Sequence, residues 1–121
     1  MRKTRPTPES PRPAPQQPTF VAFAQSAGFD ANGGYGYAIG TDLNATVGRA
    51  NAECVARAKT SCADEGYCML KPGLWGAWAS DLKYIGSKAF TCNLSSEDEA
   101  RNRAQAWCGE GCKVLWTGVG Q

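Results

Sequence analysis

The sequence predicts an α+β fold made of two ββαβ-like repeats, with two helices packed on an antiparallel sheet and disulfide bonds that stabilise it. Three observations support this prediction. A helix motif occurs twice, strand-like segments flank it in both halves, and the chain of 121 residues contains six cysteines. A motif that occurs twice with the same flanking segments indicates one structural unit used twice.

Residues 1–19 are predicted to form a Pro-rich flexible arm or linker, and residues 20–121 a single α+β domain. The arm contains six prolines and no apolar run, which is typical of an extended, solvated segment. Its two PxxP patterns include Pro8, Pro11 and Pro15. A spacer explains these prolines, and docking into the aromatic groove of a partner is the alternative.

The positive charge of the chain is concentrated in the same arm. The formal net charge is +2, whereas residues 19–121 contain nine Lys or Arg and ten Asp or Glu. A folded part without excess positive charge gives nucleic-acid binding no electrostatic support. The sequence has no apolar run long enough for a transmembrane helix. It also has no recognisable signal peptide, although Arg2-Lys3 resembles the charged start of one.

The first repeat is predicted to span residues 20–72. Strands are expected at 20–24, 35–39 and 68–70; the second of these alternates large and small side chains, as a half-buried strand does. A helix is expected to begin at Thr41 or Asp42. Its spacing places one set of residues on a single face: Leu43, Val47, Ala50, Cys54 and Ala58.

The second repeat is predicted to span residues 73–117, with strands at 75–79, 87–92 and 112–116. Its helix has the stronger start signal, because two serines precede the acids at 97–99, which forms a capping box and complements the helix dipole. Gly109 is expected to end this helix. One face is predicted to be buried: Ala100, Ala104, Trp107 and Cys108.

The two helices and the strands before them can be aligned. Thr41-Asp42 aligns with Ser95-Ser96, and Cys54 aligns with Cys108. Upstream, residues 21–24 match residues 76–79. Each repeat is therefore expected to run strand, turn, strand, capped helix, strand.

The six cysteines favour structural disulfides and an oxidising compartment, because an even number in a small domain is typical of both. A zinc site is not favoured, since the chain has neither a CxxC pair nor a histidine. A reactive thiol is not favoured either, because no histidine is present to lower its pKa. The lack of histidine also removes Ser-His-Asp and Cys-His catalysis.

The preferred pairing of the cysteines is Cys54–Cys92, Cys62–Cys68 and Cys108–Cys112. Cys54 and Cys62 are eight residues apart, which on one continuous helix is about 12 Å and too far for a disulfide. If the first helix stops at Cys54 instead, a second set becomes the better one: Cys54–Cys62 and Cys68–Cys92.

One stretch of the second half carries a family resemblance. Residues 76–79, then Ser95 and Ala100, then residues 106–109 and 111–115 resemble the bacterial domain of unknown function four-one-eight-nine. The resemblance covers residues 20–117 and is looser in the first half. It implies a small, exported, Cys-paired protein with two repeats. It implies no catalytic residue, because the family has no agreed activity.

Enzymatic activity is not predicted, and no cofactor or metal is expected. Without histidine, acid–base catalysis would need paired carboxylates across a cleft. The acidic candidates are better explained by helix capping and by turns: Asp30, Asp42, Asp81, Asp98 and Glu99. A small acid–base hydrolase is therefore the least favoured alternative.

The number of aromatic residues indicates a binding surface as well as a core. Trp75, Trp116 and Tyr35 are predicted to be exposed, because they lie near element ends or in a Gly-rich strand. The leading hypothesis is a secreted or periplasmic, non-catalytic protein-interaction module, such as an effector, an inhibitor or an accessory subunit of an envelope assembly. It would dock through the Pro-rich arm and an aromatic patch. A cell-wall or glycan-binding module that uses exposed tryptophan is the alternative.

Overall fold

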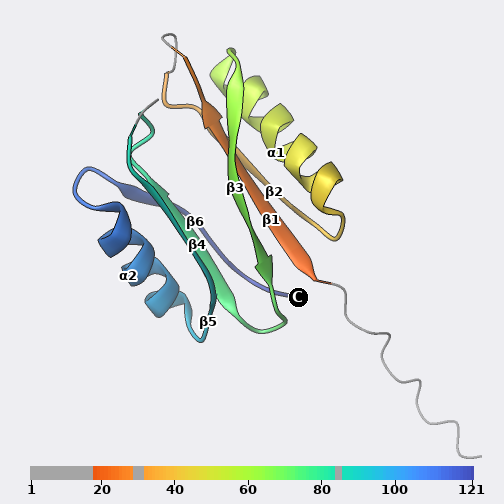
Figure 1. The fold of residues 1–121 in the computed structure, drawn as a ribbon, viewed down its shortest axis with the longest axis vertical. Coiled ribbons are helices and arrows are strands. Elements are labelled where there is room, and N and C mark those ends of the chain that lie inside the picture. Colours follow the sequence, from red (N-terminus) through yellow and green to blue (C-terminus); the bar gives the residue numbers. More distant parts are fainter. Residues whose placement is uncertain (1–17, 29–31, 84–85) are drawn as a thin grey trace, which may run out of the picture.

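Two units with the same order of elements follow one another along the chain in the computed structural model, which describes residues 18–28, 32–83 and 86–121 (Figure 1). The first unit contains β1 (Thr19–Ser26), β2 (Tyr35–Gly40), α1 (Leu43–Ala58) and β3 (Cys62–Leu70). The second contains β4 (Trp75–Ser80), β5 (Lys88–Leu94), α2 (Glu97–Cys108) and β6 (Lys113–Val119). The predicted ββαβ order is confirmed. Pro8, Pro11, Pro15 and Asp30 lie outside the described residues.

The strands form two antiparallel sheets with the same topology. The order is β2-β1-β3 in the first sheet and β5-β4-β6 in the second, so the first strand of each unit is central. The register shifts at the same place in both, after Phe23 in β1 and after Trp78 in β4, opposite the last strand of the unit. A bulge of this kind increases the local twist and bend of the strand.

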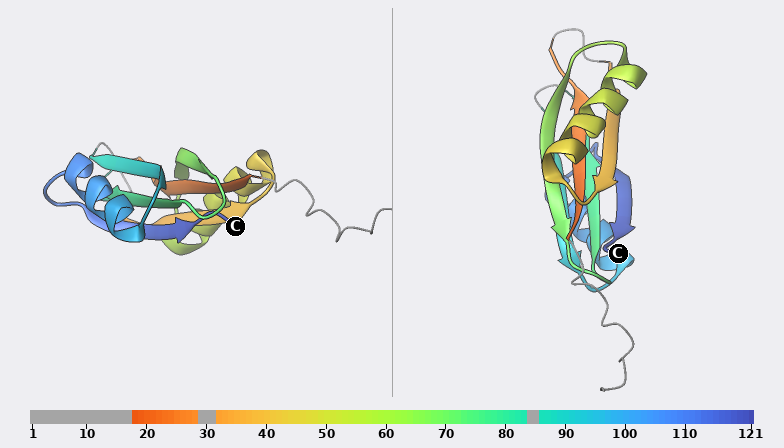
Figure 2. Two further views of the ribbon diagram at one scale, coloured as in Figure 1. Left: turned by 90° about the horizontal axis from the view of Figure 1, so that it is seen from below. Right: turned by 90° about the vertical axis from the view of Figure 1, so that its right-hand side faces the viewer.

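The two sheets face each other, and each helix covers the outer face of its own sheet. Alternate residues of β4 show this arrangement. Ala77 and Ala79 pack against the buried face of α2, whereas Trp78 between them lies in a cluster that combines residues of both sheets. Figures 1 and 2 show α1 and α2 on opposite outer sides of the pair of sheets. The result is four layers, with the aromatic core in the middle.

Both helices begin at the predicted caps. The Asp42 side chain accepts from the N–H of Ala45, and Ser96 Oγ accepts from the N–H of Glu99 at 3.1 Å. In the second box, the Glu99 carboxylate accepts in return from Ser95. The buried face of α1 is the stripe Thr46, Ala50, Cys54 and Ala58. Val47, which was predicted on this face, is only partly buried.

The preferred disulfide pairing is wrong for two of the three bonds. The structure contains Cys54–Cys62, Cys68–Cys92 and Cys108–Cys112. The helix does not stop at Cys54 but continues to Ala58, and Lys59 caps it in the left-handed conformation with φ 60°. The chain then reverses, so that Cys62 opens β3 and returns to within 6.2 Å of Cys54, Cα to Cα. The distance argument failed because Cys62 is not on the helix.

The Cys68–Cys92 disulfide joins the two sheets along one side of the sandwich, where β3 and β5 are neighbours. Asn93 reinforces this seam: its side chain donates to the carbonyl of Met69 at 3.0 Å and accepts from the N–H of Lys71 at 2.8 Å. A salt bridge of 2.8 Å between Lys88 and Glu65 adds a further contact. The edges of β3 and β5 are therefore held together by covalent and polar contacts.

The middle of the sandwich is an aromatic cluster centred on Phe23. Its ring lies 4.8 Å from Trp78, 5.0 Å from Phe90 and 5.5 Å from Trp116, between ring centroids. Trp116 is only 7% exposed, so the prediction that it forms a surface is wrong. The reason is the register of β6, which places Trp116 opposite Trp78 and facing the other sheet.

Candidate interaction surfaces

The acidic residues considered for catalysis have structural roles where the structure describes them. Asp42 caps α1, while Asp98 and Glu99 lie in the first turn of α2. Asp81 closes the turn after β4, where its carboxylate accepts from the N–H groups of Ser87 and Lys83 at 3.0 and 2.9 Å. These backbone hydrogen bonds hold the pKa of Asp81 below its usual value, and the bond from Ser87 has the largest effect.

The described part of the chain contains neither a metal-binding cluster nor a membrane-spanning helix. Residues 18–28, 32–83 and 86–121 contain no group of three or more Cys, Asp or Glu side chains placed to hold a metal ion. Neither of the helices described there is long and apolar enough to cross a membrane. The candidate sites are therefore sought among exposed apolar side chains and hollows on the surface.

The predicted aromatic surface residues are not exposed as expected. Trp116 is buried, and the other two are only partly exposed: Trp75 packs beside the α2 cluster, and Tyr35 lies edge-on to Trp78 at 5.7 Å. Trp107, predicted to be in the core, is instead 64% exposed. The narrow buried stripe of α2 is formed by small residues spaced four apart, and Trp107 lies beside that stripe.

A cluster of apolar side chains, here named the β3 patch, consists of the exposed Tyr67 and Met69 and the half-buried Phe20. Tyr67 and Met69 are 51% and 49% exposed. Phe20 and Met69 are direct partners across β1 and β3, and the rings of Phe20 and Tyr67 meet edge to face at 6.2 Å. Cross-strand neighbours of this kind form one continuous surface.

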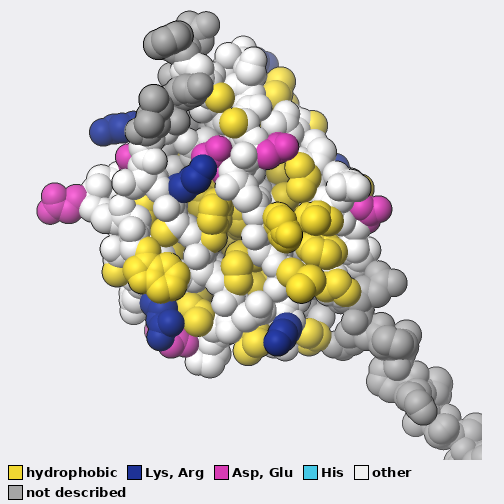
Figure 3. Space-filling view, viewed as in Figure 1, with side chains coloured by type: hydrophobic (Ala, Val, Ile, Leu, Met, Phe, Trp, Pro, Cys, Tyr) yellow, Lys and Arg dark blue, Asp and Glu magenta, His cyan; other side chains and the backbone are white. Residues whose placement is uncertain are grey.

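The β3 patch is exposed because α1 lies mainly over β2 and β1 and reaches β3 less. The outer face of β3 is therefore not covered by the helix of its own unit. Figure 3 shows hydrophobic side chains gathered on this side of the molecule, between β3 and the beginning of α1. The alternation of residues along the sequence did not predict this exposed patch. Whether a strand face is buried or exposed depends on which part of the sheet the helix covers.

The two ends of the described domain lie beside this patch. The N–H of Gln121 donates to Thr19 Oγ1 at 3.2 Å, and Gly120 forms backbone hydrogen bonds with residues 73 and 74. Figure 1 shows the C-terminus next to the start of β1. Phe20 follows Thr19 directly, so the point where the chain enters the domain is adjacent to the β3 patch.

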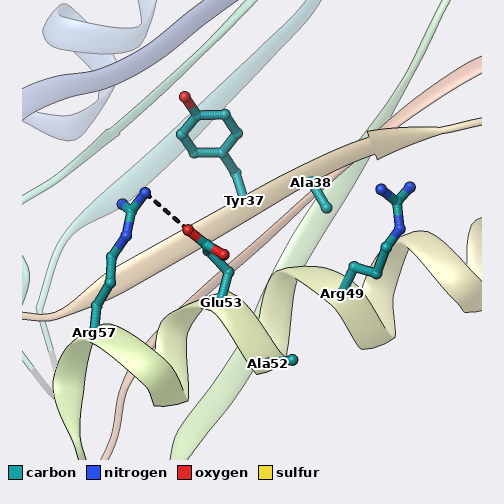
Figure 4. A pocket seen from close by; sticks show the side chains of 6 residues that line it. All are labelled: Tyr37, Ala38, Arg49, Ala52, Glu53 and Arg57. Atoms are coloured by element: carbon teal, nitrogen blue, oxygen red, sulfur yellow. Dashed lines mark ion pairs between the residues drawn. The ribbon is translucent and has the colours of Figure 1, made fainter.

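A second surface is an open hollow of about 510 Å³ between α1 and the edge of β2 (Figure 4). It is lined by Tyr37, Ala38, Arg49, Ala52, Glu53 and Arg57. The hollow exists because the strand face under the helix consists of small residues. A Cβ on Gly36, for example, would overlap the backbone of Cys54, so α1 lies very close to β2 and leaves its long side chains at the edge.

The charged side chains of this hollow form a row along α1. Arg49, Glu53 and Arg57 are spaced four residues apart and point to the same side of the helix (Figure 4). Arg57 pairs with Glu53 at 3.0 Å, and Arg49 Nη2 donates to the carbonyl of Ile39 at 2.7 Å. This site was missed by sequence reasoning. The signal for it was the row of charged residues at helical spacing, beside a strand whose residues on the helix side are glycine and alanine.

Comparison with known proteins finds no matching family model, no matching curated protein and no matching solved structure.

Proposed function

We propose that this protein is an exported, non-catalytic interaction module that binds a partner protein through the β3 patch. The observation that carries the proposal is the exposure of Tyr67 and Met69 on a sheet face that α1 leaves open. Aromatic residues and methionine are enriched at protein interfaces, and a small number of them usually provide most of the binding energy.

Secretion or a periplasmic location forms part of the proposal. Three disulfides in so short a chain suit an oxidising compartment, where thiols are not kept reduced. Membership in the exported Cys-paired family that residues 20–117 resemble would place the protein in the same compartment. An effector, an inhibitor or an accessory subunit of an envelope assembly would each use such a module.

The Pro-rich arm gives the proposed partner a second contact. It enters the domain at Thr19, which precedes Phe20 of the β3 patch. A partner that binds both the patch and a PxxP segment would gain affinity by linkage, since the second contact becomes intramolecular. Loss of either contact should then weaken binding without abolishing it.

The test compares defined variants against a purified partner. The intact protein, with its disulfides formed, is used to capture proteins from an envelope extract; the captured protein is then purified and its affinity measured. We expect Tyr67→Ala combined with Met69→Ala to weaken binding at least about tenfold. Trp107→Ala is the matched control, because it removes an exposed aromatic side chain of the second unit. Equal affinity of the wild-type and patch variants would refute the proposal.

A glycan-binding role is the second candidate, and the exposure of Trp107 is the observation that favours it. An exposed indole can pack against the apolar C–H face of a sugar ring. Retention on purified peptidoglycan that is lost in Trp107→Ala and kept in the Tyr67/Met69 variant would support this second function over the first.

A further inference from the structure

The outer edge of β2 has backbone groups available for another strand. Among the described residues, β2 pairs with β1 alone. The N–H of Ser26 donates to the carbonyl of Gly34, which fixes which residues of β2 are bonded to β1. Because antiparallel partners alternate, Gly36 and Ala38 face β1, while the backbone groups of Tyr35, Tyr37 and Ile39 point outward. The bond from Arg49 to the Ile39 carbonyl agrees with this direction.

This edge has neither a proline nor a bulge, although two arginines of α1 lie across it: Arg49 donates to the Ile39 carbonyl, and the Arg57 guanidinium lies 5.8 Å from the centre of the Tyr35 ring. Edge strands are commonly protected by charged residues, proline or a bulge. β2 has the sequence Tyr-Gly-Tyr-Ala-Ile-Gly, and its register with β1 is regular. By contrast, β3 of the same sheet is held at its edge by the Cys68–Cys92 disulfide and by Asn93. The edge of β2 is therefore covered by side chains of α1 alone, whereas the edge of β3 is joined to the other sheet.

The charged row on α1 lies where the side chains of an added strand would point. Residues four apart on a helix are about 6 Å apart along its axis, and alternate residues of a strand are about 6.7 Å apart. The row Arg49, Glu53, Arg57 therefore matches three alternate side chains of a strand laid along β2. Figure 4 shows these three side chains reaching toward β2 beside Tyr37 and Ala38. The complementary charges on the added strand are negative, positive, negative.

The opposite face of an added strand would meet apolar groups. Tyr37 and Ile39 point to the space between the sheets, where they remain 36% and 45% exposed. Trp116 of β6 lies 6.4 Å from the ring of Tyr37. Side chains that pack here would cover apolar surface on both sheets.

We propose that the edge of β2 takes up an extended segment of a partner protein with the alternating pattern acidic–apolar–basic–apolar–acidic. Backbone hydrogen bonds to Tyr35, to Tyr37 and to the N–H of Ile39, whose carbonyl already accepts from Arg49, would hold the segment, as in other cases of strand addition. The acidic side chains would pair with Arg49 and Arg57 and the basic one with Glu53. Exposed pairs of this kind add modest affinity each, so their main effect is to select the charge pattern and register.

This proposal extends the interaction role to a surface separate from the β3 patch. Each of the two proposals can be refuted without refuting the other. Loss of binding in the Tyr67/Met69 variant would leave a peptide at β2 unaffected. A negative result at β2 would leave the β3 patch proposal standing.

The test uses two synthetic peptides and a charge-reversed protein. One peptide contains Glu-Val-Lys-Val-Glu and the other the inverted Lys-Val-Glu-Val-Lys, with identical flanks. The variant Arg49→Glu, Glu53→Lys, Arg57→Glu inverts the row while keeping an ion pair between positions 53 and 57. We expect the wild-type protein to prefer the first peptide by about tenfold in Kd and the variant to prefer the second by a similar factor.

Hydrogen exchange provides a second measurement on the wild-type protein. The amides of Tyr35, Tyr37 and Ile39 should gain protection when the first peptide binds, and Tyr37→Pro, which removes one outward N–H, should weaken binding. Equal binding of both peptides to both proteins would overturn the proposal, as would protection confined to other strands. Self-association that Tyr37→Pro abolishes, without peptide binding, would also overturn it, because the occupant would then be a second copy of this chain.

Discussion

The two units share a framework but differ at the position where each faces the other. In both, a disulfide ties the end of the helix to the beginning of the last strand or the turn before it: Cys54–Cys62 in the first and Cys108–Cys112 in the second. In the first unit, Gly66 lies opposite Phe23; in the second, Trp116 lies opposite Trp78. Equivalent positions thus hold the smallest and the largest side chain.

This difference allows the two sheets to fit together. A Cβ on Gly66 would lie 3.0 Å from the ring of Phe90, so the first unit makes room for an aromatic ring of the second. On the other side, Trp116 extends toward Tyr37 of the first unit. The small residue of one unit therefore lies where the other unit places a large one, as close packing of a protein core requires. The asymmetry also leaves one side joined by Cys68–Cys92 and the other with the open edge of β2.

The largest expected effect comes from making the second unit resemble the first. Trp116→Gly should lower the free energy of unfolding by about 3–5 kcal/mol, because it removes a buried indole and leaves a cavity beside Phe23. Guanidinium unfolding with the disulfides intact measures the change. Trp107→Ala, which removes an exposed indole, should change stability by no more than about 0.5 kcal/mol. Similar losses in the two variants would contradict the assignment of Trp116 to the core.

The disulfide between the units should contribute more than those within them. Replacing Cys68 and Cys92 by alanine opens a loop with a sequence separation of 24 and should cost roughly 3.5 kcal/mol in the chain-entropy model. The same change at Cys108 and Cys112, with a separation of 4, should cost roughly 2 kcal/mol. The order of melting temperatures checks this, and the reverse order would show that strain or residual structure outweighs loop length.

A smaller effect of opposite sign is expected in α1. Gly48 is exposed in the middle of this helix, and a Cβ there would meet no other atom within 4 Å. Gly48→Ala should therefore stabilise the protein by up to about 1 kcal/mol through helix propensity. Gly36→Ala is the contrasting variant: it should destabilise, because the added methyl group would overlap the backbone of α1 at Cys54. Denaturant midpoints of the two variants should move in opposite directions.

The smallest expected effect is a pH dependence from Asp81. The pKa of this carboxyl is lowered in the folded state by hydrogen bonds from the backbone of Ser87 and Lys83. Its contribution to stability is therefore present above the unfolded pKa, about 3.9, and is lost as the pH falls through the lower folded value. Asp81→Asn should be less stable than wild type near neutral pH and should approach it in strong acid. A difference that stays constant down to the lowest pH would contradict this role.

Local signals predicted most of the secondary structure. The caps at Asp42 and Ser96 formed as expected, because a cap depends only on the few residues that follow it. The strand segments were correct in position but short at several ends, β3 most of all, which begins at Cys62 rather than Cys68. Its Gly66 and the two consecutive acids Asp64 and Glu65 weakened the strand pattern, and pairing with β1 overrode that weakness.

Residues whose environment depends on distant parts of the chain were predicted poorly. Trp116 was predicted to be exposed and is buried, whereas Trp107 was predicted to be in the core and is exposed. The burial of each depends on which face of its strand or helix packs against another layer. The β3 patch and the hollow beside Arg49 also arise from the position of α1 over its sheet. No local pattern reports that position.

The sequence by itself determined the repeated order of strands and helices, the helix starts and the use of cysteine, because these depend on neighbours along the chain and on composition. Only the tertiary structure decided which sulfur atoms pair, which tryptophan is buried and which strand edge stays open. These features depend on how two sheets and two helices are placed in space, and that placement is set by packing between residues far apart in the sequence.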